Sequence, residues 1–284
     1  MTGAEFRQLT ADVVLLDGAT GSNLMKAGLP RGVCTELWLL EHPQVIEDLQ
    51  RRYVQAGSQI VYAPTFTASR PYLQERGLGD QVGEINRRLV ELSRRAVGER
   101  AYVAGDMTTT GRADTPYDTL LEVYTQQAKA LRDAGVDLFV IETMMGLEET
   151  MAALEACKLV SDMPVMCSFS VTADGMLYFG GSVYDAAPQL EGFGADAVGI
   201  NCSCGPDQME TVVHSLAENC TVPILAKPNA GMPVIDDQGN AVYSMDAFQF
   251  GKHMASLRKA GATLLGGCCG TDPAYISSLR DAVK

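Results

Sequence analysis

Residues 197–202 read Ala-Val-Gly-Ile-Asn-Cys, in which four residues without polar side chains are followed at once by Asn201 and Cys202. A continuous apolar run is typical of a strand that is buried on both faces of a parallel sheet. Similar runs recur along the chain, and a longer segment of helical period separates each from the next. The predicted strands are residues 13–16, 60–63, 102–104, 138–141, 165–169, 197–200, 224–226 and 263–265.

The segments between these runs carry apolar residues at helical spacing. Several of them end in Ala-Gly just before the next strand, at Gly57, Gly135 and Gly261. Glycine at this place adopts the left-handed conformation that ends a helix. The predicted helices are residues 36–56, 80–97, 117–134, 147–160, 185–193, 206–218, 245–260 and 273–283.

Eight strand-then-helix units in 284 residues predict an α/β protein, a (β/α)8 TIM barrel that occupies residues 1–284 as a single domain. The rival is a doubly wound open sheet. That fold has fewer strands as a rule, and no Gly-rich dinucleotide fingerprint follows the first strand here. The pattern therefore favours the barrel.

The formal net charge of −13 argues against non-specific binding to nucleic acid or to an anionic membrane. No apolar stretch reaches the roughly 20 residues that cross a bilayer. The first 18 residues lack the basic-then-apolar layout of a secretory signal. Eight cysteines without an export signal indicate a reducing compartment, so we expect a cytoplasmic protein.

In a (β/α)8 barrel the active site lies at the carboxyl ends of the strands. Carboxylates, hydroxyls and thiols follow the predicted strands, and the fold would gather them around one mouth although they are spread over the whole chain. These strand-end residues include Asp17, Thr65, Asp106, Glu142, Ser168, Asn201, Cys202, Lys227, Cys268 and Cys269.

Three of these residues predict a metal site. Cys202, Cys268 and Cys269 each follow a predicted strand, and three thiolates that converge form a soft anionic site suited to zinc. Three protein ligands leave one position open, which is the arrangement of a catalytic zinc. The alternatives for the adjacent pair are a strained vicinal disulfide or two core thiols. The flanking glycines favour metal, because they let both sulfurs turn toward one ion.

The other cysteines have simpler explanations. Cys157, Cys167 and Cys220 are expected to be small core residues. Cys204 lies two residues after Cys202, and we expect it not to be a ligand.

The two carboxylates also have simpler alternatives. Asp17 and Glu142 follow predicted strands, and the alternative role of a carboxylate at this place is to cap the next helix. The run Asp-Gly-Ala-Thr-Gly at 17–21 is also typical of a turn whose backbone N–H groups bind an anion, such as a substrate carboxylate.

Five motifs resemble those of the zinc-dependent homocysteine S-methyltransferases, a family that includes the homocysteine-binding domain of cobalamin-dependent methionine synthase. They cover nearly the whole chain in the expected order, and the pairing of GINC with GGCCG is the most specific feature. The motifs are DGATG at 17–21, PTFTAS at 64–69, GINC at 199–202, KPNAG at 227–231 and GGCCGT at 266–271.

The resemblance implies a homocysteine-binding TIM barrel with Zn²⁺ as its cofactor. It places the metal on Cys202, Cys268 and Cys269. It also implies that Asp17 and Glu142 hold the amino group of homocysteine, and that backbone groups near Gly18 and the hydroxyl of Thr65 help to place this amino acid.

The predicted reaction gives methionine, with the homocysteine sulfur bound as a thiolate at the fourth zinc position. The partners are thus homocysteine and a methyl donor, with no nucleic acid and no membrane. Three donors are consistent with the sequence: a methyl-corrinoid on a separate protein, S-methylmethionine, and a quaternary amine. An aromatic cage would favour a cationic donor. The loops 107–117 and 229–243 are expected to shape the entrance for the donor. The available aromatic residues, which otherwise pack in the core, are Trp38, Tyr62, Phe66, Tyr72 and Tyr178.

Other functions fit parts of the pattern. One is methyl transfer to another small thiol or selenol. A second is a non-catalytic zinc-binding subunit that docks a partner. A third is a redox protein with a Cys268–Cys269 dithiol, which leaves Cys202 unexplained.

Overall fold

The computed structural model describes residues 1–236 and 241–283, and within them the eight predicted strands form one parallel sheet. The sheet order is β1-β10-β7-β6-β5-β4-β3-β2, and a parallel bridge between Leu16 and Ile60 joins its two ends into a barrel. The predicted α/β class and TIM barrel are therefore confirmed. The strands are β1 (Val14–Leu15), β2 (Ile60–Tyr62), β3 (Tyr102–Thr108), β4 (Leu138–Met144), β5 (Val165–Phe169), β6 (Ala197–Asn201), β7 (Ile224–Lys227) and β10 (Ala262–Leu265).

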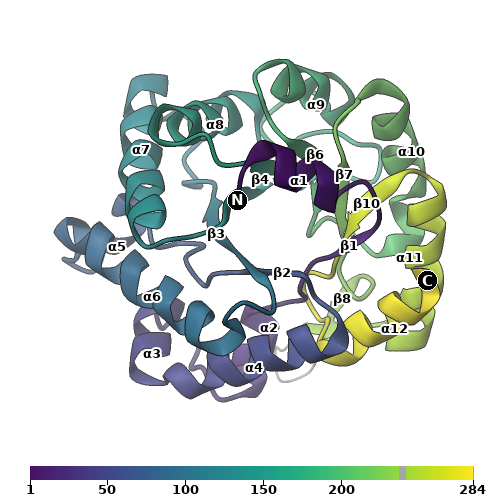
Figure 1. The fold of residues 1–284 in the computed structure, drawn as a ribbon, viewed down its shortest axis with the longest axis horizontal. Coiled ribbons are helices and arrows are strands. Elements are labelled where there is room, and N and C mark those ends of the chain that lie inside the picture. Colours follow the sequence, from purple (N-terminus) through teal and green to yellow (C-terminus); the bar gives the residue numbers. More distant parts are fainter. Residues whose placement is uncertain (237–240, 284) are drawn as a thin grey trace.

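Helices surround this barrel in a ring (Figure 1). Three of the predicted helix ends carry the expected glycines, with φ of 123° at Gly57, 82° at Gly135 and 115° at Gly261. The ring and its connections comprise α2 (Gly21–Lys26), α3 (Thr35–Glu41), α4 (Pro43–Ala56), α5 (Arg70–Gln74), η1 (Gly79–Gln81), α6 (Val82–Val97), α7 (Tyr117–Asp133), α8 (Leu147–Val160), α9 (Val183–Gly192), η2 (Pro206–Gln208), α10 (Glu210–Asn219), α11 (Ala247–Lys259) and α12 (Pro273–Val283).

The apolar residues form two clusters, one inside the barrel and one between the barrel and its helices. The alternation of side chains along each strand produces this division. Cys157, Cys167 and Cys220 are buried in the outer cluster, as expected.

Helix α1 (Gly3–Leu9) was not predicted, and it lies across the amino-terminal end of the barrel (Figure 1). Thr2 and Glu5 form a capping box at its start. Phe6 is fully buried in the inner cluster. Helix α1 therefore closes the amino-terminal end of the barrel. A functional site is accordingly expected at the carboxyl-terminal end.

The prediction of one helix over residues 36–56 is wrong in one respect, because the structure has two helices there. Helix α3 ends at Glu41 and α4 begins at Pro43. Proline lacks the N–H that would continue the first helix, and it disfavours helical geometry at the residue before it. His42 accordingly has φ −125° and ψ 55°.

The predicted loop over residues 229–243 contains an antiparallel hairpin, β8 (Pro233–Ile235) with β9 (Ala241–Tyr243). Residues 237–240 of that loop lie outside the described part of the chain. The helices α2 and α5, both short, were also missed by the periodicity.

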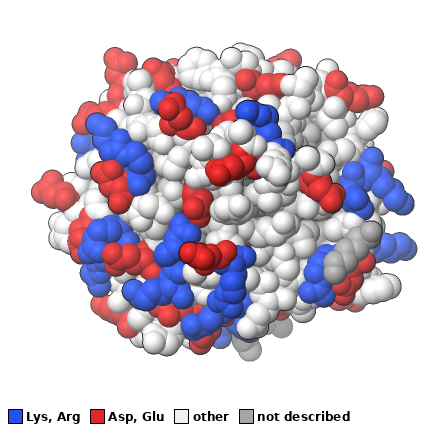
Figure 2. Space-filling view, viewed as in Figure 1, with Lys and Arg blue, Asp and Glu red and all other residues white. Residues whose placement is uncertain are grey.

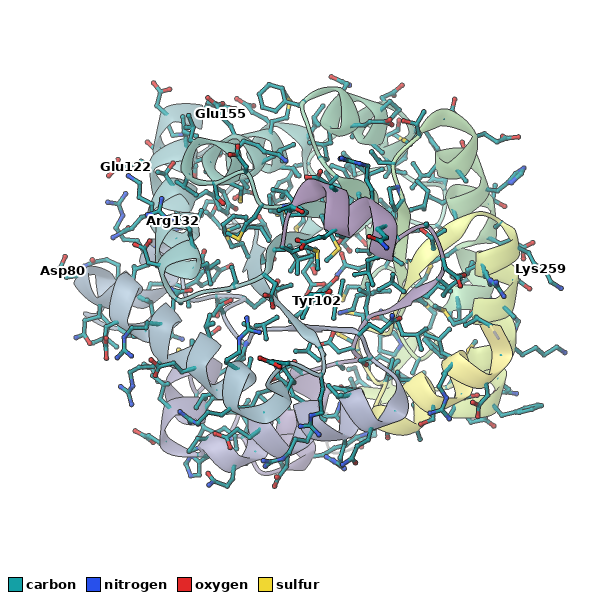
Figure 3. The ribbon with its side chains drawn as sticks, viewed as in Figure 1. Asp80, Tyr102, Glu122, Arg132, Glu155 and Lys259 are labelled. Atoms are coloured by element: carbon teal, nitrogen blue, oxygen red, sulfur yellow. The ribbon has the colours of Figure 1, made fainter. Side chains whose placement is uncertain are left out.

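Charged side chains cover the rim of the face seen in Figure 2, where basic and acidic residues alternate. Asp80, Glu122 and Lys259 project outward from the helix ring in Figure 3. Among the described residues, no helix combines the length and apolar character that a bilayer crossing requires.

Gly199 in β6 tests the closeness of the barrel strands. A Cβ at this position would lie 1.9 Å from the carbonyl oxygen of Leu225 in β7. Because a backbone atom cannot move aside without disturbing the sheet, we expect Gly199→Ala to lower the free energy of unfolding by about 2–3 kcal/mol. Chemical denaturation measures this change.

Gly192 in α9 is the matched control, since a Cβ there meets no atom within 4 Å. We expect Gly192→Ala to be neutral or to stabilise by up to about 1 kcal/mol. Equal stability of Gly199→Ala and the wild-type protein would contradict the strand packing described here.

Candidate metal and substrate site

The sulfur atoms of Cys202, Cys268 and Cys269 come together at the carboxyl end of the barrel. Cys202 follows β6, and the adjacent pair follows β10. Their sulfurs lie within 4.8 Å of one another, with 3.6 Å between Cys202 and Cys269. None of the three forms a disulfide.

Backbone hydrogen bonds hold the two segments against the loop that follows β7. The N–H of Cys268 donates to the carbonyl of Pro228 at 2.7 Å, and the N–H of Ala230 donates to that of Cys269 at 2.9 Å. The side-chain amide of Asn229 donates to the carbonyl of Cys202 at 3.0 Å. Three strand ends are thus tied together around the sulfurs.

Two conformational features orient the thiols. Cys202 has φ 56°, a left-handed conformation that costs a non-glycine residue roughly 1–2 kcal/mol. Gly270, directly after the cysteine pair, has φ 85°. Such strain at a cluster of reactive groups is typical of a functional site.

The donor set fits zinc. Zn–S bonds of about 2.3 Å in a tetrahedron place two sulfurs about 3.8 Å apart, close to the observed separation. Hydrogen bonds with Cys202 and Cys268 lower the pKa of Cys269 to about 3, which favours its thiolate form. The side-chain oxygen of Asn229, at the edge of this cluster, is buried without a partner. Cys204 lies outside the trio and is buried.

The sulfurs face a cavity of about 440 Å³. Asp17, Gly18 and Glu142, which the sequence analysis assigned to the substrate, line the same cavity. Thr65 does not reach its surface. It is fully buried, and its hydroxyl is bonded to the backbone of Asp106.

Asp17 forms a buried ion pair with Lys227 that the sequence analysis missed. The lysine nitrogen lies 2.8 Å from the carboxylate, and both side chains are at least 96% buried. The N–H of Tyr62 donates to the other oxygen of Asp17, and the lysine nitrogen lies 3.5 Å above the centre of the Tyr62 ring. A lysine that ends a buried apolar strand was the signal available in the sequence.

Glu142 is fixed by Asn201, another residue without a predicted role. The amide nitrogen of Asn201 donates to the carboxylate at 3.2 Å and to the hydroxyl of Thr143 at 2.7 Å. Its oxygen accepts hydrogen bonds from the N–H of Thr143 and the hydroxyl of Ser168. Burial raises the pKa of Glu142 to about 7, although Lys227 acts in the opposite direction.

Asp106 is a further carboxyl residue that lines this cavity. It is 95% buried, and its Oδ1 has no hydrogen-bond partner. Burial, together with the charge of Glu142, raises its pKa well above the usual range.

Two of the aromatic residues that were considered for a cage lie at the cavity. Tyr62 and Phe66 line the cavity, but Lys227 covers one face of the Tyr62 ring. Trp38 stacks on His42, and the hydroxyl of Tyr72 donates to the carbonyl of Thr109.

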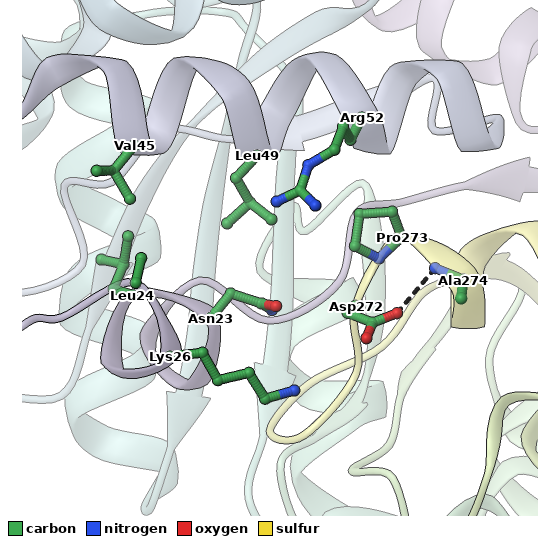
Figure 4. A pocket seen from close by; sticks show the side chains of 10 residues that line it. Asn23, Leu24, Lys26, Val45, Leu49, Arg52, Asp272, Pro273 and Ala274 are labelled. Atoms are coloured by element: carbon green, nitrogen blue, oxygen red, sulfur yellow. Dashed lines mark hydrogen bonds between the residues drawn. The ribbon is translucent and has the colours of Figure 1, made fainter.

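A second cavity, of about 500 Å³, lies outside the barrel between α2, α4 and the start of α12 (Figure 4). Asn23 lines this cavity and connects it to the loop that follows β1. Its side-chain amide donates to the carbonyls of Ala19 and Thr271. Lys26, Arg52 and Asp272 also line this cavity.

Comparison with known proteins agrees with this geometry. The family model "Homocysteine S-methyltransferase" matches residues 14–283. The methionine synthases of Mycobacterium leprae and Mycobacterium tuberculosis are both 29% identical to the chain in alignments of 299 positions, gaps included, that cover 97% of this chain. The chain spans about a quarter of the length of these curated relatives, 24% and 25% respectively.

Solved structures give the same result over a whole chain. The oxidized form of the homocysteine methyltransferase MmuM from Escherichia coli superimposes with a TM-score of 0.81 at 26% identity, covering 95% of this chain and 96% of that one. Its metallated form gives a TM-score of 0.80 at the same identity and coverage. The chain therefore belongs to the homocysteine S-methyltransferase family, as the sequence motifs predicted.

The pKa of Glu142 predicts a pH dependence of stability. Between its ordinary pKa of 4.5 and the value of about 7 in the folded state, the folded protein holds a proton that the unfolded chain has released. Stability contributed by this group therefore falls as pH rises through that window, by up to about 1.4 kcal/mol per pH unit, and the cost is complete above pH 7. We expect Glu142→Gln to gain stability relative to the wild-type protein as the pH rises from 4.5 to 8.

Urea denaturation of both proteins, freed of metal by a chelator and kept reduced, measures this difference. Glu122→Gln, which removes a solvent-exposed carboxyl, is the control and should follow the wild-type curve. Parallel curves for Glu142→Gln and wild type would show that the Glu142 carboxyl is not held protonated.

Proposed function

We propose that this chain is a zinc-dependent S-methyltransferase that moves a methyl group from a donor to the sulfur of homocysteine, giving methionine. The observation that carries the proposal is the meeting of three cysteine sulfurs and a buried group of charged side chains in one cavity at the carboxyl end of the barrel. In the net reaction, the acceptor sulfur loses its proton to solvent and gains the methyl group. The donor atom keeps the electron pair of the broken bond, so a cationic donor is left neutral.

Cys202, Cys268 and Cys269 are the residues that would hold the metal. Zinc held by three thiolates would lower the pKa of an incoming thiol and keep the sulfur as a nucleophile. The chain fixes its own sulfurs through the backbone hydrogen bonds around β6, β7 and β10. This rigidity suits a reaction that depends on the alignment of sulfur and methyl carbon.

The polar floor of the cavity orients the amino acid. The carboxylates of Glu142 and Asp17 would bind the ammonium group of the amino acid. Gly18 lines the same cavity. Thr65 acts indirectly, since its hydroxyl positions the backbone of Asp106. Phe66 and Thr67 also line the cavity, which would have to admit the methyl donor.

Cys202→Ala tests the metal assignment. Loss of one of three sulfur ligands should remove stoichiometric zinc and lower homocysteine methylation by at least about 100-fold, more than the loss of an outer-shell contact. Zinc content measured by mass spectrometry and methionine formation followed by chromatography provide the two measurements. Cys204→Ala is the matched control and should retain both. Retention of zinc and turnover in Cys202→Ala would refute the assignment.

The donor is tested with reduced, zinc-loaded protein and homocysteine. S-Methylmethionine, a quaternary amine such as betaine, and a methyl-corrinoid are supplied in separate reactions. We expect methionine with at least one of them, and none after zinc is removed by a chelator. No methionine with any donor would overturn the proposed reaction.

A further inference from the structure

The cavity contains more acidic groups than its own cation balances. Among the described residues that line it, the carboxyls are Asp17, Glu36, Asp106 and Glu142, whereas Lys227 is the one basic side chain. Buried charges need partners, because water does not solvate them there. The partners of each carboxyl therefore show which of them is free to bind a ligand.

Two of the four are already satisfied within the protein. Asp17 is paired with Lys227 and accepts the N–H of Tyr62. Glu36 accepts the N–H and the hydroxyl of Thr67 and lies 3.3 Å from the thiol of Cys34. Neither carboxyl lacks a counterpart.

The other two are under-satisfied. Glu142 receives one hydrogen bond from the amide of Asn201. Asp106 has a buried oxygen without any partner, and the hydroxyl of Tyr62, which lines the same cavity, is buried and unpartnered as well. Unpaired polar atoms at this depth are rare in folded proteins and call for a ligand or another explanation.

We infer that Asp106 is a specificity-determining residue of this cavity and that, together with Glu142, it accepts the protonated amino group of the acceptor thiol. This inference rests on the proposed function and names the chemical class of its acceptor, an amino thiol with an ammonium group. An ammonium carries three N–H donors, enough for both carboxylates and the Tyr62 hydroxyl.

The inference reassigns part of the role given to Asp17. An ammonium group beside Asp17 would share that carboxylate with Lys227, whose nitrogen lies 2.8 Å from the carboxylate oxygen. The ammonium and the lysine are both positive and would repel each other. Beside Asp106 and Glu142 it meets two carboxyls that form no ion pair within the described part of the chain, and its positive charge would favour their ionised forms. Asp17 and Lys227 then form part of the cavity wall as an ion pair, and Asp106 selects a ligand that carries a positive charge.

Asp106→Asn tests this inference, because it removes the ability of the side chain to ionise and keeps its shape. The ligands are L-homocysteine and 4-mercaptobutyrate, which lacks only the amino group. We expect the substitution to weaken homocysteine binding by about 10- to 100-fold, the effect of a lost hydrogen bond to a charged group. The affinity for 4-mercaptobutyrate should change by less than about threefold.

Calorimetric titration of the zinc-loaded protein gives both dissociation constants, and steady-state kinetics should show the homocysteine effect in KM with kcat changed little. Glu36→Gln is the matched control, since it removes a cavity carboxyl whose oxygens are already bonded. It should leave the ratio of the two affinities unchanged. Asp106→Ser is the second variant if the asparagine protein does not fold.

The outcomes separate the two proposals. If the wild-type protein neither binds nor methylates homocysteine, the proposed function falls, and the role of Asp106 falls with it. If the wild-type protein binds and methylates homocysteine, but Asp106→Asn lowers the affinity for both ligands equally, Asp106 is a structural residue. Only this inference is then overturned.

Discussion

The buried ion pair of Asp17 with Lys227 joins the first and seventh strands across the end of the strand that carries Cys268 and Cys269. Strand β10 lies between β1 and β7, and Gly266 passes so closely that a Cβ there would meet Asp17, Leu16 and Lys227 within 3.1 Å. The N–H of the next residue, Gly267, donates to the carbonyl of Asp17. Loss of one partner from a buried pair costs about 3–5 kcal/mol, because the other charge is left unpaired. The position of the cysteine pair therefore depends on this interaction.

The electrostatics of the cavity connect the metal and the substrate. Sulfurs and carboxyls face the same space, and Glu142 is affected by the charge of Cys269 as well as by Lys227. Each negative group raises the cost of ionising its neighbours. In the proposed function a divalent cation would relieve this repulsion at the sulfurs, and an ammonium would do so at the floor. The acceptor would then be held at both ends by charge of opposite sign, with its sulfur and its amino group in fixed places.

Much of the fold was predictable because continuous apolar runs report burial directly. All eight predicted strands are present, and the carboxyl ends of the strands gather the residues expected there. Features that depend on local geometry were not predictable in the same way. The break at Pro43 is marked by proline alone within a pattern that remains apolar at helical spacing, and α1 is amphipathic only through Phe6 and a few neighbours. The hairpin of β8 and β9 is exposed, so it carries no burial signal.

The site shows where such prediction ends. A sequence indicates which residues follow strands, but the direction of each side chain depends on the pleat and on irregularities such as the left-handed Thr143 and Cys202. Thr65 points away from the cavity for this reason, whereas Asp106 reaches it. The pairing of Asp17 with Lys227 spans 210 residues, and nothing in either motif indicates it. Asp17 and Glu142 look equivalent in the sequence, and only their partners distinguish a carboxylate that is paired with a lysine from one that has a single amide hydrogen bond and no ion pair.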